Sequence, residues 1–203
     1  MDHHLGYYAA DKELVEKVLT GDNHAFGKII KNTEGLVAMI VFKMVANSAD
    51  RKDLVQDIYL KAFDKLSGFQ FKSKLSTWIG QIAYHTCLHF LEKKKLLLLD
   101  QVGSREESHG QSLEQINNRS VSLFSNEAET ILIKKELKGI LEVEIDRLPP
   151  VYKTLLTLYQ EDLSNEEMVQ ITGLPEGTIK SYLFRARKTL KENILARYKK
   201  EDL

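Results

Sequence analysis

The sequence predicts an all-α protein, and three observations carry that prediction. Apolar residues recur at helical spacing in several windows of the chain. Strand signals are weak, because alternation of apolar and polar residues next to turn dipeptides never persists. The only three prolines are Pro149, Pro150 and Pro175, so the first 148 residues are free to form long helices.

The helical pattern divides the chain into two small domains joined by a flexible linker. Residues 11–95 are expected to form the first domain, with helices near 11–20, 23–46, 50–66 and 77–95. Residues 96–126 form the linker, because most of this stretch is rich in Ser, Gln, Asn and Glu and has no sustained period. Residues 127–200 form the second domain, in which one helix ends at Pro149 and Pro150 and three more follow.

Composition and charge restrict the class of protein. The chain has 203 residues, of which 43% are hydrophobic and 29% charged, as in ordinary globular proteins. The 29 basic and 29 acidic side chains cancel, which excludes a protein that binds polyanions with its whole surface. However, residues 65–95 carry a net charge of +5 and residues 174–200 one of +6. Each domain therefore ends in a basic helical stretch suited to phosphate contacts.

Nothing in the sequence predicts export or membrane insertion. The N-terminus lacks a basic start followed by an apolar stretch, and the longest apolar run, residues 36–42, is about a third of a spanning helix. The single Cys87 cannot form an internal disulfide. We therefore expect a soluble, cytoplasmic protein.

A helix-turn-helix is predicted in the second domain. Ser164 and Glu167 have the spacing of a capping box, which starts a short helix. Gly173 can end that helix in the left-handed conformation, and Leu174 and Pro175 supply the turn before a second helix. This order of helix, short turn and helix is typical of DNA-binding modules.

The second helix of that motif has two different faces. Its expected core stripe is Ile179, Leu183, Ala186 and Leu190. The opposite face carries basic side chains, a hydroxyl and one aromatic ring: Lys180, Ser181, Phe184, Arg185 and Lys188. Such a face can contact phosphates, guanine edges and a thymine methyl in the major groove. The alternative is a solvated basic face on a surface helix.

Two surfaces are predicted on the first domain. Leu60 lies beside Asp53, Gln56 and Asp57 on the side of its helix that should face water, which suits a protein-protein patch unless it is a stray surface leucine. The second surface is a loop of aromatics and lysines over residues 69–74, followed by a helix. On that helix, the residues expected to lie off the core stripe are Thr77, Gln81, Tyr84 and His85, with Trp78 at the edge of the stripe. Aromatics among amides and lysines are typical of single-strand binding, although core packing explains Trp78 equally well.

Four segments together resemble a bacterial RNA polymerase sigma factor. They are residues 53–63, residues 76–83, Leu148 with the two prolines that follow, and residues 173–181. The chain is similar to the extracytoplasmic-function group of the sigma-70 family, which retains only the second and fourth conserved regions. The resemblance implies a promoter-recognition subunit that binds core RNA polymerase and promoter DNA, is restrained by an anti-sigma factor, and has no catalytic residues, metal or cofactor.

The resemblance also implies roles for individual residues. Polymerase docking falls to Asp53, Gln56, Asp57 and Leu60. Capture of the melted minus-ten element falls to Phe69, Phe71, Lys72, Ser73, Lys74, Thr77, Trp78, Gln81, Tyr84 and His85. Reading of the duplex minus-thirty-five element falls to Thr178, Lys180, Ser181, Phe184, Arg185 and Lys188. Tyr84, His85 and Tyr182 depart from residues common in the family, which bears on the promoter sequence rather than on the class.

Two other readings remain open from the residues alone. A stand-alone helix-turn-helix regulator needs only the second domain and a sensing or dimerising first domain, but it leaves Leu60 and the aromatic loop unexplained. A metal enzyme is suggested by His85 and His89, four residues apart with Cys87 between them, but Cys87 points away from both and no third ligand is evident. Opening about ten base pairs costs roughly 14 kcal/mol, more than two or three stacked bases return, which favours a subunit of a larger machine.

Overall fold

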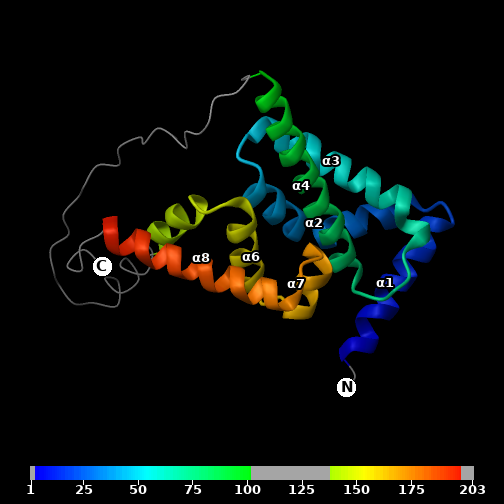
Figure 1. Ribbon diagram of the computed structural model, residues 1–203. Helices are drawn as coiled ribbons and strands as arrows, with labels where there is room; N and C mark the ends of the chain where they lie inside the picture. The colour runs from blue at the N-terminus through cyan, green and yellow to red at the C-terminus, as the bar shows by residue number, and fades with distance from the viewer. Residues whose placement is uncertain (1–2, 102–137, 198–203) are drawn as a thin grey trace, which may run out of the picture.

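The computed structural model describes residues 3–101 and 138–197, and every regular element in those ranges is helical (Figure 1). The first part of the chain holds α1 (His3–Leu19), α2 (Asn23–Met44), α3 (Ser48–Lys65), the short 3-10 helix η1 (Leu66–Gly68) and α4 (Leu75–Gln101). The second part holds a helix over residues 138–146, then α6 (Pro150–Gln160), α7 (Asn165–Thr172) and α8 (Glu176–Arg197). The all-α prediction is confirmed.

Side-chain caps fix where the helices of the first part begin. The carboxylate of Asp22 accepts hydrogen bonds from the backbone N–H groups of His24 (2.9 Å) and Ala25 (3.3 Å), which starts α2. The Asn47 side chain accepts from the N–H of Ala49 at 2.9 Å and starts α3. Both caps satisfy donors that a helix leaves unpaired at its first turn. Helices α2 and α3 therefore begin within two residues of the positions that the sequence predicts, whereas α1 begins at His3 rather than near residue 11.

The core of the first part forms where α2, α3 and α4 meet. Ile29 and Ile40 of α2, Ile58 of α3, and Ile79 and Ala83 of α4 are all essentially inaccessible to solvent. Helix α4 is the longest of the described elements, and it continues past residue 95 into the predicted linker as far as Gln101. The rest of the linker lies outside the described residues, so the domain boundaries stay a prediction.

The second part has its own buried stripe, in the positions expected from the sequence. Ile179, Leu183, Ala186 and Leu190 of α8 are all buried, and they pack with residues of α6 and α7. Pro150 occupies the first turn of α6, where its missing N–H costs nothing, so the proline pair starts this helix as well as ending the previous one.

The two parts pack against each other. Helix α7 lies against α4, and α6 lies against α2, so one continuous apolar core runs through both parts (Figure 1). Gly80 of α4 permits the close approach, because a Cβ there would lie 3.4 Å from the Ile171 side chain and 3.1 Å from Leu36. Ion pairs between described residues also join the parts, among them Lys43 with Asp146 at 2.8 Å and Lys74 with Glu167 at 2.9 Å.

Within residues 3–101 and 138–197, no helix combines the length and the apolar character needed to cross a bilayer.

Candidate nucleic-acid and protein interfaces

The helix-turn-helix forms as predicted. Ser164 caps α7 by accepting from the N–H of Glu167 at 3.2 Å, while the Glu167 carboxylate accepts from the N–H of Ser164 at 3.0 Å. Gly173 ends α7 with φ of 71°, a conformation that costs glycine little and other residues more. The turn also uses Thr172, whose hydroxyl accepts from the N–H of Leu174 at 3.2 Å. Hydrogen bonds within a few residues therefore define where α7 begins and ends and how the turn before α8 is closed.

The predicted reading face of α8 is open to solvent. Phe184 is 69% exposed, the highest value among the described large apolar side chains, and Arg185 and Lys188 are exposed beside it. Lys180 is exposed and pairs with Glu176 one turn earlier at 2.7 Å. Ser181 and Thr178 are half-buried, and the Ser181 hydroxyl donates to the Thr178 carbonyl at 2.8 Å. A long, basic, convex helix with one exposed ring is what a major groove accepts.

The patch predicted on α3 is also exposed. Leu60 is 65% exposed, next to exposed Asp53 and Gln56. Asp57 is half-buried and pairs with Lys61 at 2.6 Å, on the same helix. Single exposed leucines are common on surface helices, so the role of this patch as a protein interface stays a prediction.

Sequence reasoning missed an aromatic pair beside that patch. Phe63 of α3 is 45% exposed, and its ring packs edge-on against Phe26 of α2 with ring centroids 5.0 Å apart. The available signal was spacing, because Phe63 follows Leu60 by three residues and so shares its side of the helix.

The aromatic loop before α4 forms a compact cluster. The Phe69 ring lies 4.7 Å from that of Phe71 and 5.1 Å from that of Trp78, centroid to centroid. Phe71 has φ of 56°, a left-handed conformation that costs a residue with a side chain about 1–3 kcal/mol. The packing of Phe69 against Phe71 and Trp78 offsets this cost, so the loop keeps one defined shape.

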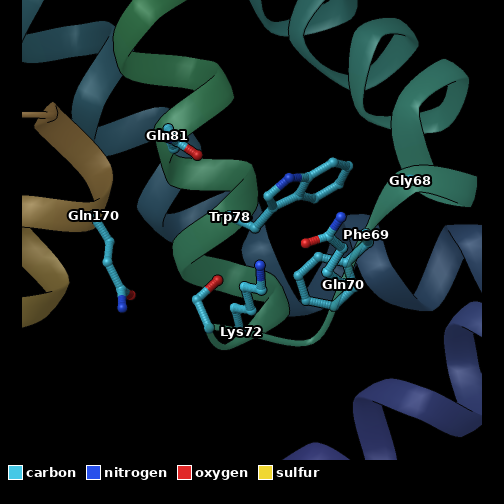
Figure 2. Close-up of a pocket in the computed structure, with 8 residues that line it drawn as sticks. Gly68, Phe69, Gln70, Lys72, Trp78, Gln81 and Gln170 are labelled. Carbon is cyan, nitrogen blue, oxygen red and sulfur yellow. The ribbon is translucent and has the colours of Figure 1, made fainter.

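A pocket of about 270 Å³ lies beside this cluster (Figure 2). It brings together five of the predicted minus-ten residues with three that the sequence did not single out. The predicted ones are Phe69, Lys72, Ser73, Trp78 and Gln81, and the others are Gly68, Gln70 and Gln170. This volume is slightly below that of pockets that bind drug-sized ligands. Together with the aromatic and amide lining, it suits one small flat group. Figure 2 shows Gln170 reaching this space from α7, across from Phe69.

Part of the predicted minus-ten face of α4 is not exposed, which corrects an expectation from the sequence. Thr77 and Tyr84 were expected to face away from the core, but both are only 3% exposed. The reason is tertiary, because α2, α3 and α7 all pack on α4 and its buried surface extends beyond the stripe that the sequence predicts. Burial raises the pKa of the Tyr84 hydroxyl, and the neighbouring Tyr182 of α8 raises it further. His85 is half-buried, and its ring would lie 3.7 Å from a Cβ built at Gly173.

Lys74 of the aromatic loop meets an acidic partner from α7. Its ammonium lies 2.9 Å from a carboxylate oxygen of Glu167, and both side chains are partly buried. Burial acts to raise the pKa of Glu167, but hydrogen bonds from Lys74 and Ser164 outweigh it and lower the pKa below its ordinary value. Glu167 is therefore ionised at neutral pH and holds the lysine by charge.

Cys87 and the two histidines near it do not gather into a ligand set. Cys87 is fully buried, and burial raises the pKa of its thiol to about 12. His89 is exposed, with Nδ1 3.4 Å from a carboxylate oxygen of Glu92. In the part of the chain that the structure describes, no three His, Cys, Asp or Glu side chains are grouped to hold a metal ion.

Comparison with known proteins places both parts in one family. Residues 29–96 match the family model of sigma-70 region 2, and residues 138–190 match that of sigma-70 region 4. The chain belongs to the sigma-70 family of RNA polymerase sigma factors. The region 2 match covers most of α2, all of α3 and the greater part of α4, and the region 4 match contains the helix-turn-helix.

Full-length relatives identify the group within the family. The chain is 30% identical over 188 residues to the ECF RNA polymerase sigma-E factor of Haemophilus influenzae, covering 91% of this chain and 95% of the relative. It is also 30% identical over 189 residues to the sigma-E factor of Escherichia coli, covering 91% and 94%. This sigma factor is thus of the extracytoplasmic-function group and serves promoter-directed transcription. The family consists of initiation factors that are not enzymes.

Solved structures share the fold. CnrH in complex with the cytosolic domain of CnrY matches with a TM-score of 0.60 and 16% identity, covering 93% of this chain and 99% of that one. RpoE in complex with the anti-sigma factor NepR from Bartonella quintana matches with a TM-score of 0.60 and 21% identity, covering 85% and 98%.

Proposed function

We propose that this sigma factor docks on core RNA polymerase through α3 and reads a promoter at two places, minus-thirty-five as duplex and minus-ten as separated strand. The observation that carries the proposal is the different chemistry of two exposed surfaces on the two parts of the chain. The face of α8 is convex and basic, as a groove-reading helix requires. The pocket beside α4 is hollow and lined by aromatic and amide groups, as capture of an unpaired base requires.

Recognition of the minus-thirty-five element rests on α8. Arg185 and Phe184 stand at the centre of its exposed face, with Lys180 and Lys188 one turn to either side. The arginine has the reach and the paired donors to bind a guanine edge, and the ring can contact a thymine methyl. The lysines, as flexible point charges, suit phosphates and set the register of the helix on the duplex.

Recognition of the minus-ten element rests on the pocket and the loop that frames it. Trp78 is half-buried at the pocket and offers a ring for stacking, which contributes about 1–3 kcal/mol per base, whereas Phe69 is only 7% exposed and supports Trp78 from the core, with ring centroids 5.1 Å apart. Gln70 and Gln81 supply donors and acceptors for the edge of a flipped base, and Lys72 supplies positive charge for the backbone. Stacking and amide contacts together would select an unpaired strand over duplex DNA.

Docking on polymerase rests on the α3 patch. Leu60 provides the apolar centre, and the surrounding acids and amide provide a polar rim, which is the usual anatomy of a protein interface. Because the patch lies on α3 and the reading face lies on α8, the two surfaces share no helix, and one protein can bind polymerase and duplex together. We also propose that this chain acts in the cytoplasm and is restrained there by an anti-sigma factor, as the structural neighbour RpoE is solved with the anti-sigma factor NepR.

The test uses a matched pair of arginines on α8. Arg185→Ala removes the proposed base contact, whereas Arg187→Ala removes the same charge from a side chain that stacks over Tyr159, 4.6 Å from its ring centroid. Losing a bidentate base contact costs about 1–3 kcal/mol, or roughly 5- to 150-fold in transcription that depends on the minus-thirty-five element. Arg187→Ala is expected to change it less than threefold, about 0.5 kcal/mol. Equal losses in the two variants, or loss of core binding with Arg185→Ala, would refute the assignment.

A stand-alone helix-turn-helix regulator, the alternative that the residues alone left open, differs from a sigma factor in how it would bind DNA. It predicts tight, sequence-specific binding of the purified protein to duplex DNA without polymerase. The sigma assignment predicts that specific binding at physiological salt requires the core enzyme. An electrophoretic mobility assay with and without core polymerase separates the two.

A further inference from the structure

We propose that Asp11 of α1 positions the aromatic loop, residues 69–74, by capping α4 from a different helix. The inference rests on the minus-ten role proposed above for this loop and its pocket, and it assigns part of that role to a helix outside both matched regions. The region 2 match begins at residue 29, whereas α1 ends at Leu19. Asp11 acts through the backbone of α4 and touches no nucleotide, which makes it a positioning residue.

The residues at the start of α4 are poor caps. Lys74 precedes the helix, and its ammonium can only donate hydrogen bonds. The first turn of α4, residues 75–78, contains no acidic side chain. A helix leaves its first N–H groups unpaired and its N-terminus partly positive, so an acceptor there is stabilising, above all an anionic one. The cap of α4 is therefore left to another part of the chain.

Asp11 supplies that acceptor. Its carboxylate accepts a hydrogen bond from the backbone N–H of Leu75, the first residue of α4, at 2.9 Å and across 64 positions of sequence. Asp11 is half-buried and Leu75 is only 2% exposed, so water competes weakly for this contact. Val15 and Val18, one and two turns further along α1, are buried in the core and hold the helix in place. A fixed helix therefore presents a carboxylate to the N-terminus of α4.

Helix α1 contacts the chain at both ends of the aromatic loop. Before the loop, α1 packs on η1, whose last residue, Gly68, also lines the pocket. After the loop, Asp11 holds the backbone of Leu75. Figure 1 shows α1 beside the chain that joins α3 to α4. Because both ends of a short loop are held, α1 limits the paths that the residues between them can take.

The strained backbone of the loop depends on such anchors. Phe71 has φ of 56°, a conformation that persists in a residue with a side chain only where the surroundings over-determine it. The ring packing of Phe69 supports this conformation from within the loop, and the bond from Asp11 to Leu75 supports it from outside. Without that bond the loop can relax to an unstrained path. Relaxation would change the lining of the pocket beside Trp78.

The first measurement uses Trp78, the only tryptophan of the chain, to detect a change in the loop. Trp78 is half-buried at the pocket, so acrylamide quenching of its fluorescence reports how well the loop covers the ring. In the free, full-length protein, Asp11→Ala is expected to raise the quenching constant about twofold, because the cap is lost and the loop relaxes. Alanine is the best helix former, so this variant does not weaken α1 itself.

Two further variants show whether the hydrogen bond is the cause. Asp11→Asn keeps an oxygen that accepts the same bond and should stay within about 1.3-fold of the wild-type quenching constant. Glu16→Ala removes the same charge from an exposed position of α1 and should also match wild type. Unchanged quenching in Asp11→Ala, or equal quenching in Asp11→Ala and Asp11→Asn, overturns the cap and the proposal with it.

The second measurement asks whether the cap controls promoter reading. Holoenzyme made from core polymerase and each variant transcribes a promoter at which wild-type protein directs initiation, together with templates in which single minus-ten or minus-thirty-five bases are changed. The readout is the ratio of transcript from the parent template to transcript from each changed template. A fall in the stability of the protein lowers both transcripts by the same factor and leaves this ratio unchanged.

The expected result is a loss of discrimination at one element only. Asp11→Ala should lower the ratio about fivefold for at least one minus-ten base, the weaker end of what a hydrogen-bonded base contact contributes, and leave the minus-thirty-five ratios unchanged. Asp11→Asn and Glu16→Ala should keep every ratio within about twofold of wild type.

The outcomes separate this inference from the function on which it rests. If wild-type transcription is insensitive to every minus-ten base, the reading function is refuted and the positioning role falls with it, even where quenching shows that the cap forms. If wild type and Asp11→Ala discriminate equally well, the positioning role alone is refuted. If Asp11→Ala lowers the minus-ten and minus-thirty-five ratios alike, Asp11 acts on the whole fold and the proposal is overturned.

Discussion

Leu60→Asp should abolish assembly with core polymerase while leaving the fold intact. The side chain is 65% exposed, so the free protein gains little from its packing, and substitutions at such positions usually change the free energy of unfolding by less than about 0.5 kcal/mol. The same exposure means that about two thirds of its surface is available to a partner. Stability and assembly are therefore expected to respond very differently to one change.

The size of the assembly effect follows from two contributions. Burying a whole leucine side chain contributes about 1.5–3 kcal/mol, of which the exposed two thirds amounts to about 1–2 kcal/mol. An aspartate at the same place adds a carboxylate beside Asp53 and Asp57, and leaving it desolvated and unpaired costs at least about 1–3 kcal/mol. A total near 3 kcal/mol raises the dissociation constant for core polymerase by about 100-fold.

The assay is competition for core polymerase between labelled wild-type protein and each variant, with chemical denaturation run in parallel. Leu19→Asp is the matched control, because Leu19 on α1 is 54% exposed and lies outside the α3 patch. It should compete like wild type. Unchanged competition by Leu60→Asp, or an equal loss in both variants, would refute the patch. A large fall in stability of Leu60→Asp would contradict the premise that its side chain is free of the core.

Three further predictions concern the helix-turn-helix and the core. Ser164→Ala should lower the free energy of unfolding by about 1 kcal/mol in a denaturant titration, whereas Ser164→Asn keeps a cap and most of the stability. Equal losses of stability in the two variants would contradict the capping box. Gly173→Ala should cost about 1 kcal/mol because φ is 71°, and Gly173→Asn should cost less; a neutral alanine would count against the left-handed turn. Cys87 is buried, and with a pKa of about 12 only about one thiol in 10⁴ is ionised at pH 8, so iodoacetamide should label it only in denaturant. Rapid labelling of the native protein would show that reagent reaches this thiol and would contradict its burial.

Local signals predicted the individual helices well. The capping box at Ser164, the left-handed Gly173 and the stripe from Ile179 to Leu190 all depend on neighbours within a few residues, so the sequence contains them directly. The exposure of Leu60 was predictable for the same reason, because helical spacing places this one apolar residue among polar residues on the outward face of α3.

The packing of the two parts was not predictable from such patterns. Tyr84 lies off the core stripe of α4, and no local rule shows that a helix from residue 165 onward will cover it. Gln170 was missed at the pocket, because its distance from Trp78 in the sequence gives no hint of their closeness in space. Phe63 was missed too, although its spacing from Leu60 could have placed it in the same patch.

Promoter binding at two places is the proposal on which the others depend. It is tested by transcription from genomic DNA by core polymerase with and without the protein, with start sites mapped at nucleotide resolution. We expect new starts that appear only when the protein is added and that share one element near minus thirty-five and another near minus ten. An unchanged set of starts, or new starts that share a single element, would contradict it.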